Sequence, residues 1–439
     1  MMKKIATLSA VIAVSMAGWA QGDPKEAPAA GQTEKTSGAE EMVVDLQTAI
    51  SEALQYNKQL QNSVLDRETY YQKVREARSQ GLPQVNASLT GTTYFGKEMK
   101  FGDMPIKMEN SLTLAATASW TFSMQQIASV KVAKIAQRLT EQTVRATEQD
   151  VKANVADTYY AVLVYDRNME IVKANLADME DIANHTEKCY EAGTVEKTDV
   201  DQINVNLATL KNALLSLQRS LESTKRLLVL QMGVDIKTNI KAAQTLDQFL
   251  ATTSEQLDTA NMDISQNVNY QQLLLNREIT EQTVKMRKFA YIPTLTASYQ
   301  YSNAIKGGFM NFDHIGNLTL TVPIFSGFAR HSQVKQAQIE ARKNETNIAL
   351  MEDNLAQNAE QYAFDLQTAQ DAYDLQKENL EVARRVLDNY KNKYNQGALS
   401  SLGLTQANQN YLQAESAYAS AALDLLMAQT KLLKLYNLL

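Results

Sequence analysis

The chain contains an internal duplication, and this feature restricts its fold more than any other. Residues 57–83 have the same length as residues 267–293, and both segments end on an aliphatic residue followed by proline. Further along, YEAGTVEKTDVDQINVNL (190–207) corresponds to YNQGALSSLGLTQANQNY (394–411). The two prolines, Pro83 and Pro293, are 210 residues apart, whereas the corresponding tyrosines and glycines of the second pair of segments are 204 residues apart. The difference between the two spacings is most simply explained by a shorter loop in the second copy. The repetition itself predicts two copies of one structural unit.

Each copy is predicted to contain a helix, a β-hairpin, a long helix and a further helix. The first copy covers residues 43–235, with its hairpin at about 84–122, and the second covers residues 262–439, with its hairpin at about 294–325. Residues 236–261 connect the two copies. Gly and Pro are scarce, with 16 and 6 residues in 439, so turns are few and the elements between them are long.

The hairpins carry the alternation of apolar and polar residues that is typical of strands. In NSLTLAATASWTF (110–122) the apolar residues fall on one side and small, hydroxylated residues on the other. Segments 85–95, 294–302 and 316–325 show the same pattern, the first of them weakly. A tilted strand needs about 9–11 residues to cross a bilayer. One such strand alone fits a soluble sheet packed on helices, but four of them predict barrel strands between lipid and water.

Aromatic residues near both ends of the predicted strands indicate interfacial girdles. At the helical end they are Trp120, Phe122, Phe325 and Phe328; at the loop end they are Tyr94, Phe95 and Tyr301, with Phe101, Phe309 and Phe312. Four strands cannot close a barrel, and an open sheet edge in hydrocarbon leaves backbone groups unsatisfied. The chain is therefore expected to pool its strands with copies of itself, as a dimer or a trimer.

Two long stretches without internal proline, residues 124–190 and 327–394, follow the hairpins. Both carry apolar and aromatic residues at alternating steps of four and three, the heptad pattern of helices that coil against partners. At 1.5 Å per residue, each helix would reach about 100 Å. Both hairpins start where one helix ends and finish where another begins, so all helices leave one rim of the sheet. The hairpin loops, about 96–109 and 303–315, are predicted at the other rim.

The N-terminus predicts export. Residues 1–20 combine Lys3 and Lys4, an apolar core of about 13 residues and a small-x-small site, as in a signal peptide. Gln21 follows the expected cleavage, so no lipoprotein cysteine stands there, and residues 21–42 form a polar tether expected to be disordered. The expected location is the outer membrane, with the helices in the periplasm and the hairpin loops outside.

Charge and cysteine content argue against several classes of protein. The formal net charge is −6 with Lys and Arg dispersed among Asp and Glu, unlike the basic face of a nucleic-acid-binding protein. The single cysteine, Cys189, excludes an internal disulfide framework and a multi-cysteine metal site. His185 and Cys189 stand four residues apart and make at most half a metal site. No catalytic constellation is recognisable, so we expect no enzyme, no cofactor and no bound metal.

This arrangement resembles the TolC family, the outer-membrane channels of tripartite efflux pumps and type I secretion systems. The resemblance spans about residues 43–437 and rests on the duplicated plan, the Leu/Ile-Pro start of each hairpin, VPIFSG (322–327) and two Tyr-x-x-Gly turns. It implies a homotrimer whose twelve-stranded barrel continues into a twelve-helix, coiled-coil periplasmic tunnel. The implied function is passive conduction of drugs and toxic small molecules, with a periplasmic adaptor and an inner-membrane pump of RND or ABC type as partners.

Two alternative functions stay open at this point. Type I protein secretion uses channels of the same family, and an exported coiled-coil scaffold explains the heptads without explaining the strands. A scaffold would lack detergent-requiring trimers that are rich in both strand and helix.

By resemblance, the two glycine-containing turns form the far end of the helices, where the adaptor docks. The docking candidates are Gly193, Thr194, Val195, Gly397, Ala398 and Leu399. The gate candidates near the same end are Asp199, Asp201, Tyr390 and Tyr394. The family often has acids after both turns, whereas Gly403 and Gln406 stand at such positions after the second turn here. Two roles stay open for the two aspartates: capping a helix N-terminus, or lining the pore entrance.

Overall fold

The computed structural model describes residues 42–95, 98–101, 104–107, 110–253, 263–307 and 313–439. The predicted signal peptide and residues 21–41 of the predicted tether lie outside these residues. Met42, the last residue of the tether prediction, belongs instead to a short strand.

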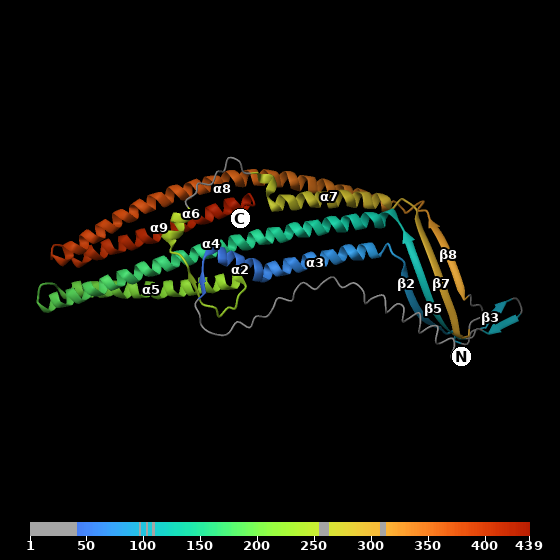
Figure 1. Cartoon of the computed structure of the whole chain (residues 1–439), viewed down its shortest axis with the longest axis horizontal. Helices are drawn as coiled ribbons and strands as arrows, with labels where there is room; N and C mark the ends of the chain where they lie inside the picture. The colour runs from blue at the N-terminus through green and yellow to red at the C-terminus, as the bar shows by residue number, and fades with distance from the viewer. Residues whose placement is uncertain (1–41, 96–97, 102–103, 108–109, 254–262, 308–312) are drawn as a thin grey trace. The chain divides into compact units, whose positions relative to one another are not determined.

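Long helices make up most of the described chain, and strands interrupt them in each copy (Figure 1). The helices are α2 (Leu46–Tyr56), α3 (Lys58–Ser79), α4 (Met124–Glu191), α5 (Lys197–Met232), α6 (Leu246–Thr253), α7 (Val268–Phe289), α8 (Ala329–Asn395) and α9 (Ser401–Leu435), with a short 3-10 helix, η2 (Ile264–Gln266), before α7. The strands are β1 (Met42–Val44), β2 (Gln84–Thr92), β3 (Glu98–Phe101), β4 (Met104–Lys107), β5 (Ser111–Phe122), β6 (Ile240–Ala242), β7 (Thr294–Lys306) and β8 (His314–Thr321). None of the helices in the described part of the chain is both long and apolar enough to cross a membrane.

The two longest helices, α4 and α8, have 68 and 67 residues. Neither contains glycine or proline, the residues that most disfavour a helix interior. Ser123 caps α4 by accepting a hydrogen bond from the Gln126 N–H at 3.2 Å. α8 begins at Ala329 rather than at the predicted residue 327, because Gly327 and Phe328 both have positive φ, at 56° and 64°. Each long helix packs against the next one in the chain, α4 against α5 and α8 against α9 (Figure 1).

Four strands form one antiparallel sheet in the order β2-β5-β7-β8, so the hairpins of the two copies lie side by side. Residues that pair across neighbouring strands share a face of the sheet. One face is largely apolar and includes Val85, Ala87, Leu89, Leu114, Ala116, Ala118, Trp120, Phe122, Leu295, Ala297, Tyr299, Tyr301, Leu318 and Leu320, with the polar residues Asn303 and His314 toward its loop end. The other face carries hydroxyl and amide groups, including Asn86, Ser88, Thr117, Ser119, Thr121, Thr296, Ser298, Gln300, Asn317 and Thr319. The register therefore joins the alternation of four separate segments into two continuous faces.

Two strands are shorter than predicted. β2 stops at Thr92 and β8 at Thr321, whereas the sequence pattern extended to residues 95 and 325. Pro323 has no N–H to donate to a neighbouring strand, and the φ of 51° at residue 95 is outside the extended region. Four predicted girdle residues therefore lie in segments that flank the strands: Tyr94, Phe95, Phe325 and Phe328.

The region predicted as a plain loop at about 96–109 contains a further hairpin, formed by β3 and β4. Its strands have four residues each, which is too short for alternation to distinguish them from a loop. The second copy has no strand among the described residues between β7 and β8. The two copies therefore differ most at the loop end of their hairpins.

The segment predicted as a connection at 236–261 takes part in the core. β6 pairs in parallel with β1, and α6 packs against α4. Arg167 of α4 donates one hydrogen bond to Asp247 of α6 and another to Glu415 of α9, the second at 3.4 Å. Its guanidinium also lies 4.9 Å from the ring centre of Tyr418. These contacts tie the connecting segment to helices of both copies, beside the larger of the two buried core clusters.

Two asparagines at corresponding positions of the copies, Asn57 and Asn267, each hold two helix ends together. Asn57 Oδ1 accepts hydrogen bonds from the first N–H groups of α3, and its Nδ2 donates to Gln231 O near the end of α5 at 2.7 Å. Asn267 caps α7 in the same way and donates to Leu435 O of α9 at 2.9 Å. Each side chain satisfies backbone groups that helix ends leave without partners.

We expect Asn57→Ala and Asn267→Ala each to lower the free energy of unfolding by about 2–4 kcal/mol, because each loses a helix cap and a long-range hydrogen bond. Asn62→Ala, at an exposed position of α3, is the matched control and should cost less than about 1 kcal/mol. Thermal unfolding followed by circular dichroism measures the difference. Equal unfolding temperatures for the Asn57 and Asn62 variants would contradict the clamping role.

Candidate functional site

The two helical hairpins, α4–α5 and α8–α9, end in turns of the same geometry. Gly193 and Gly397 both have a φ of 73°, the left-handed conformation that glycine adopts without strain. In both turns the glycine N–H donates to the carbonyl three residues before it, and the following N–H donates to the carbonyl five residues before it, all at 2.9 Å. This is the Schellman motif, which satisfies the last carbonyl groups of a helix.

The docking candidates lie on and around these turns. They are exposed at Gly193, Thr194, Gly397 and Ala398, and half-buried at Val195 and Leu399. The Thr194 hydroxyl donates to the carbonyl of Cys189 at 2.8 Å, so it belongs to the turn itself. A Cβ atom at either glycine would meet nothing within 4 Å. The surface above both turns is open, and its small side chains leave the backbone within reach of a partner.

Tyr394 joins α8 to α4. Its hydroxyl lies 2.6 Å from Thr186 Oγ1, and burial raises the pKa of Tyr394 above its ordinary value, so the phenol is neutral at physiological pH. Tyr390 is half-buried against the same core cluster as Tyr394. The cluster draws residues from all four helices of the two hairpins: Met179, Ile182, Ile203, Leu210, Leu387, Tyr394, Leu404 and Ala407.

Asp199 caps α5 and also joins α5 to α9. Its Oδ2 accepts a hydrogen bond from the Glu196 N–H at 3.3 Å, and its Oδ1 accepts one from the Ser401 hydroxyl. Asp201 is exposed and lies 3.8 Å from the Lys197 amine, one helical turn earlier. The structure therefore gives Asp199 both a capping contact and a contact between hairpins, whereas Asp201 forms an exposed ion pair within α5.

A further contact between the hairpins was not predicted from the sequence. Asn175 of α4 and Asn408 of α9 are buried and exchange side-chain hydrogen bonds, one of them at 3.0 Å. Other buried polar atoms nearby, including Asn206 Nδ2 of α5 and Thr405 Oγ1 of α9, have no hydrogen-bond partner among the described residues. The predicted heptad positions of α4 include Leu176 but not Asn175; the spacing of Asn175, three residues after Val172 and four before Met179, is the signal that could have found it. A buried asparagine in a coiled-coil seam fixes the register of the helices.

The girdle candidates at the helical end form exposed aromatic pairs. Trp120 Nε1 donates to Gly81 O at 2.9 Å, and its ring centre lies 6.3 Å from that of Phe122. Phe325 and Phe328 meet edge to face at 5.7 Å, with 76% and 72% of their surfaces exposed. At the loop end, the candidates are Tyr94 and Tyr301, which are half-buried, and Phe95, which is exposed. Exposed apolar rings of this size mark a contact with lipid or with another chain.

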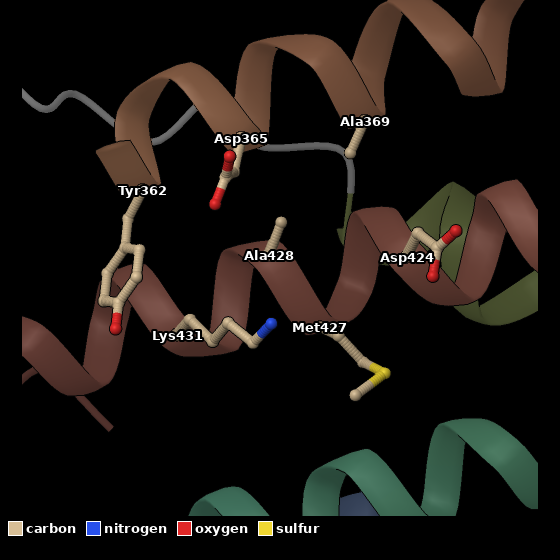
Figure 2. Close-up of a pocket in the computed structure, with 7 residues that line it drawn as sticks. All are labelled: Tyr362, Asp365, Ala369, Asp424, Met427, Ala428 and Lys431. Atoms are coloured by element: carbon tan, nitrogen blue, oxygen red, sulfur yellow. The ribbon is translucent and has the colours of Figure 1, made fainter. Parts of the chain in front are cut away.

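Two other places hold reactive side chains without an assembled site. His185 Nε2 and Cys189 Sγ lie 3.6 Å apart, but no group of three or more His, Cys, Asp or Glu among the described residues is arranged to hold a metal ion. A pocket between α8 and α9 is lined by Tyr362, Asp365, Ala369, Asp424, Met427, Ala428 and Lys431 (Figure 2).

Comparison with known proteins decides the family. Residues 49–234 and 260–438 match the outer membrane efflux protein family. The chain belongs to this family. Both matched ranges contain a complete hairpin and a long helix, and the resemblance to the TolC family drawn from the sequence is confirmed.

Two relatives show how far the similarity extends. TolC of Salmonella enteritidis is 24% identical over 305 residues, which cover 64% of this chain and 59% of TolC. The toluene efflux pump outer membrane protein TtgF of Pseudomonas putida is 23% identical over an alignment of 449 positions, which covers 95% of this chain and 90% of TtgF. The match to TolC thus spans about three-fifths of that relative.

Solved structures show the same fold. CusC superposes with a TM-score of 0.76 at 17% identity, over 92% of this chain and 95% of CusC. VceC from Vibrio cholerae gives a TM-score of 0.72 at 17% identity, over 89% of this chain and 95% of VceC. The predicted fold class, four strands per chain of an outer-membrane sheet that continue into long coiled-coil helices, is that of the outer membrane efflux protein family.

Proposed function

We propose that three copies of this chain form an outer-membrane exit duct, which passively conducts small molecules from the periplasm to the exterior. One observation carries the proposal: a four-stranded sheet with one continuous apolar face and one continuous hydroxylated face. An apolar face suits lipid, and a hydroxylated face suits a water-filled channel. Membership of the outer membrane efflux protein family agrees with this placement.

The edges of the sheet support assembly from several copies. Among the described strands, β2 and β8 each pair along one edge only. In hydrocarbon, each unsatisfied backbone group costs several kcal/mol. Pairing β8 of one copy with β2 of the next covers both edges, and three copies close a ring of twelve strands. The helices below would form the proposed twelve-helix tunnel in the periplasm.

The proposed cargo is drugs and other toxic small molecules, delivered by a periplasmic adaptor and an inner-membrane pump of RND or ABC type. TtgF is named for a toluene efflux pump, which supports small apolar cargo over secreted protein. Conduction needs no catalytic residue, and the chain is proposed to act without enzyme activity. Deleting the gene should sensitise cells to drugs and solvents. Lost protein secretion with unchanged susceptibility would contradict the proposed cargo.

Solubilised in mild detergent, the protein is expected to have three times the mass of one chain, because only partner copies can cover the edges of β2 and β8. Light scattering coupled to size-exclusion chromatography, corrected for bound detergent, measures this mass. Heating before electrophoresis should convert the trimer to monomer. A monodisperse monomer that is stable in buffer without detergent would contradict the proposed barrel.

The gate is proposed at the tip, where four polar contacts of the described residues join the hairpins of one chain. They are Tyr394 with Thr186, Asp199 with Ser401, Asn175 with Asn408, and Lys391 with Asp178. Tyr390 packs beside the first of them. Because these contacts hold α8–α9 against α4–α5, their loss would let one hairpin move away and widen the pore.

The double variant Asp199→Asn and Tyr394→Phe is expected to raise single-channel conductance several-fold in planar bilayers. It weakens two of the contacts while it keeps the size of both side chains, so the core cluster stays filled. Asp201→Asn, which changes an exposed aspartate of the same helix, is the control and should leave conductance unchanged. Equal conductance of the double variant and the wild type would place the constriction elsewhere.

A further inference from the structure

The loop end of the apolar sheet face carries a lysine that a backbone irregularity brings there. The register between β5 and β7 shifts between Leu112 and Thr113, which pair with Lys306 and Ala304. Ile305 is the extra residue, and such a bulge re-aims the side chains that follow it. Without the shift, Leu112 would pair with Ile305. With it, Lys306 takes the place beside Leu112, on the apolar face.

Closer to the middle of the sheet, the same face carries two tyrosines and a histidine. Tyr301 pairs with His314 across β7 and β8, and their ring centres lie 5.2 Å apart. The Tyr299 hydroxyl lies 2.7 Å from His314 Nδ1. When Tyr299 donates this hydrogen bond, the neutral imidazole carries its proton on Nε2 and presents a donor there.

The spacing of these groups is somewhat larger than the depth of the headgroup layer of a membrane. Ala116 pairs with Tyr301 and Leu112 pairs with Lys306, so about four residues, or about 13 Å of strand, separate the aromatic group from the lysine. A strand tilt of about 40° shortens this to about 10 Å along the membrane normal. The polar headgroup layer outside the hydrocarbon is about 5–8 Å deep on each side. With the tyrosines at the hydrocarbon boundary, the Lys306 backbone lies a few ångströms outside this layer, and the long side chain can bring its amine back to the level of the headgroups.

The end of the hairpins is held by its own contacts. Gly307 has a φ of 63°, and a Cβ atom there would lie 2.3 Å from Asn110 O. The Asn110 side chain accepts hydrogen bonds from the Thr93 hydroxyl at 3.0 Å and from the Tyr94 N–H at 3.1 Å. The residue after Lys306 is thus packed tightly against the neighbouring hairpin, which fixes where the lysine stem begins.

We propose that Tyr299, Tyr301, Lys306 and His314 form a headgroup belt for anionic lipids in the outer leaflet, in which Lys306 binds the phosphate and the other three contact the lipid nearer the acyl boundary. The inference rests on the proposed function, which puts the apolar face in lipid and the hairpin loops outside. Lys306 supplies the positive charge, and His314 supplies a hydrogen-bond donor beside ring surfaces that suit the acyl boundary. The exposed Ile305 beside the lysine favours a lipid phosphate over a phosphate ion in water.

Native mass spectrometry of detergent-solubilised trimers tests the belt with phosphatidylglycerol as the anionic probe. Phosphatidylcholine with the same acyl chains and inorganic phosphate form the other two arms. Wild-type trimers should retain phosphatidylglycerol in preference to phosphatidylcholine, and inorganic phosphate should not displace it. Lys306→Gln is expected to weaken phosphatidylglycerol binding about fivefold per site, the effect of one lysine near a charged membrane surface. Phosphatidylcholine binding should not change.

His314→Phe keeps an aromatic ring but loses the donor, and should weaken phosphatidylglycerol binding about two- to tenfold. Lys377→Gln is the control: it removes a positive charge at an exposed position of α8, outside the proposed belt, and should leave phosphatidylglycerol binding unchanged. Wild-type affinity in the Lys306 variant, or displacement of the lipid by inorganic phosphate, would overturn the belt. The same spectra report the trimer mass, so intact trimers with unchanged lipid binding refute the belt alone, whereas monomers refute the duct as well.

Discussion

Arginine at both helical turns, through Thr194→Arg and Ala398→Arg, is expected to abolish drug efflux while trimers still reach the outer membrane. Both positions are exposed, and both follow a glycine that closes a helix. The substitutions keep the glycines, so the turns can fold, but they add long charged side chains over the turns at which the adaptor is expected to dock. Minimum inhibitory concentrations of pump substrates should fall to those of the deletion strain.

The control for the docking variants is Asn212→Arg, which adds the same side chain at an exposed position of α5 away from the turns. It should leave efflux at the wild-type level. Heat-modifiable trimers in purified outer membranes measure assembly for every variant. Efflux that survives both turn substitutions at normal protein levels would show that the adaptor docks elsewhere.

Gly233→Ala is expected to be more damaging to folding than any other substitution proposed for this chain. Gly233 closes α5 with a φ of 73°, and a Cβ atom there would lie 2.1 Å from Tyr56 O and 2.9 Å from Asn57 N. Left-handed backbone costs a residue with a side chain about 1–2 kcal/mol. The collision with backbone atoms adds to this cost by displacing the junction of α2 and α3. We expect a total loss of about 4 kcal/mol or more in the free energy of unfolding.

Gly193→Ala provides the matched comparison for Gly233→Ala. Its φ is also 73°, but a Cβ atom there would meet nothing within 4 Å. Only the backbone cost of about 1–2 kcal/mol should remain. Thermal unfolding of both purified variants separates conformational strain from collision. Similar shifts in unfolding temperature for the two variants would show that the backbone at Tyr56 can move away from the added Cβ atom without loss of stability.

The long elements were predictable because their signals are local. The strand predicted at 110–122 is β5, Ser111–Phe122, and the helix predicted at 124–190 is α4, Met124–Glu191. Alternation of apolar and polar side chains predicts a strand, and absence of glycine and proline predicts a long helix. Both signals can be read within a single segment. The pairing of β1 with β6 was missed, because strands of three residues carry too little pattern to be recognised. The pairing of β5 with β7 joins the two copies and depends on packing that no single segment encodes.

The candidate site was predictable to the same extent. Glycine after a helix predicted both turns at the tip, because only their backbone conformation was needed. The partners of Tyr394 and Asp199 were not predictable, since Thr186 and Ser401 lie about two hundred residues away in sequence. Capping and lining the pore entrance stood as alternatives for Asp199. The structure shows a capping contact through one carboxylate oxygen and, through the other, a contact with Ser401 that neither alternative included.

The two outer edges of the sheet belong to different strands, β2 of the first copy and β8 of the second. Such edges associate head to tail, so a subunit with one damaged edge can still join a ring through the other. If wild-type and damaged subunits mix at random in equal amounts, about one trimer in eight contains only wild-type subunits. An allele that damages one edge should therefore be genetically dominant, whereas an allele whose product never folds should be recessive.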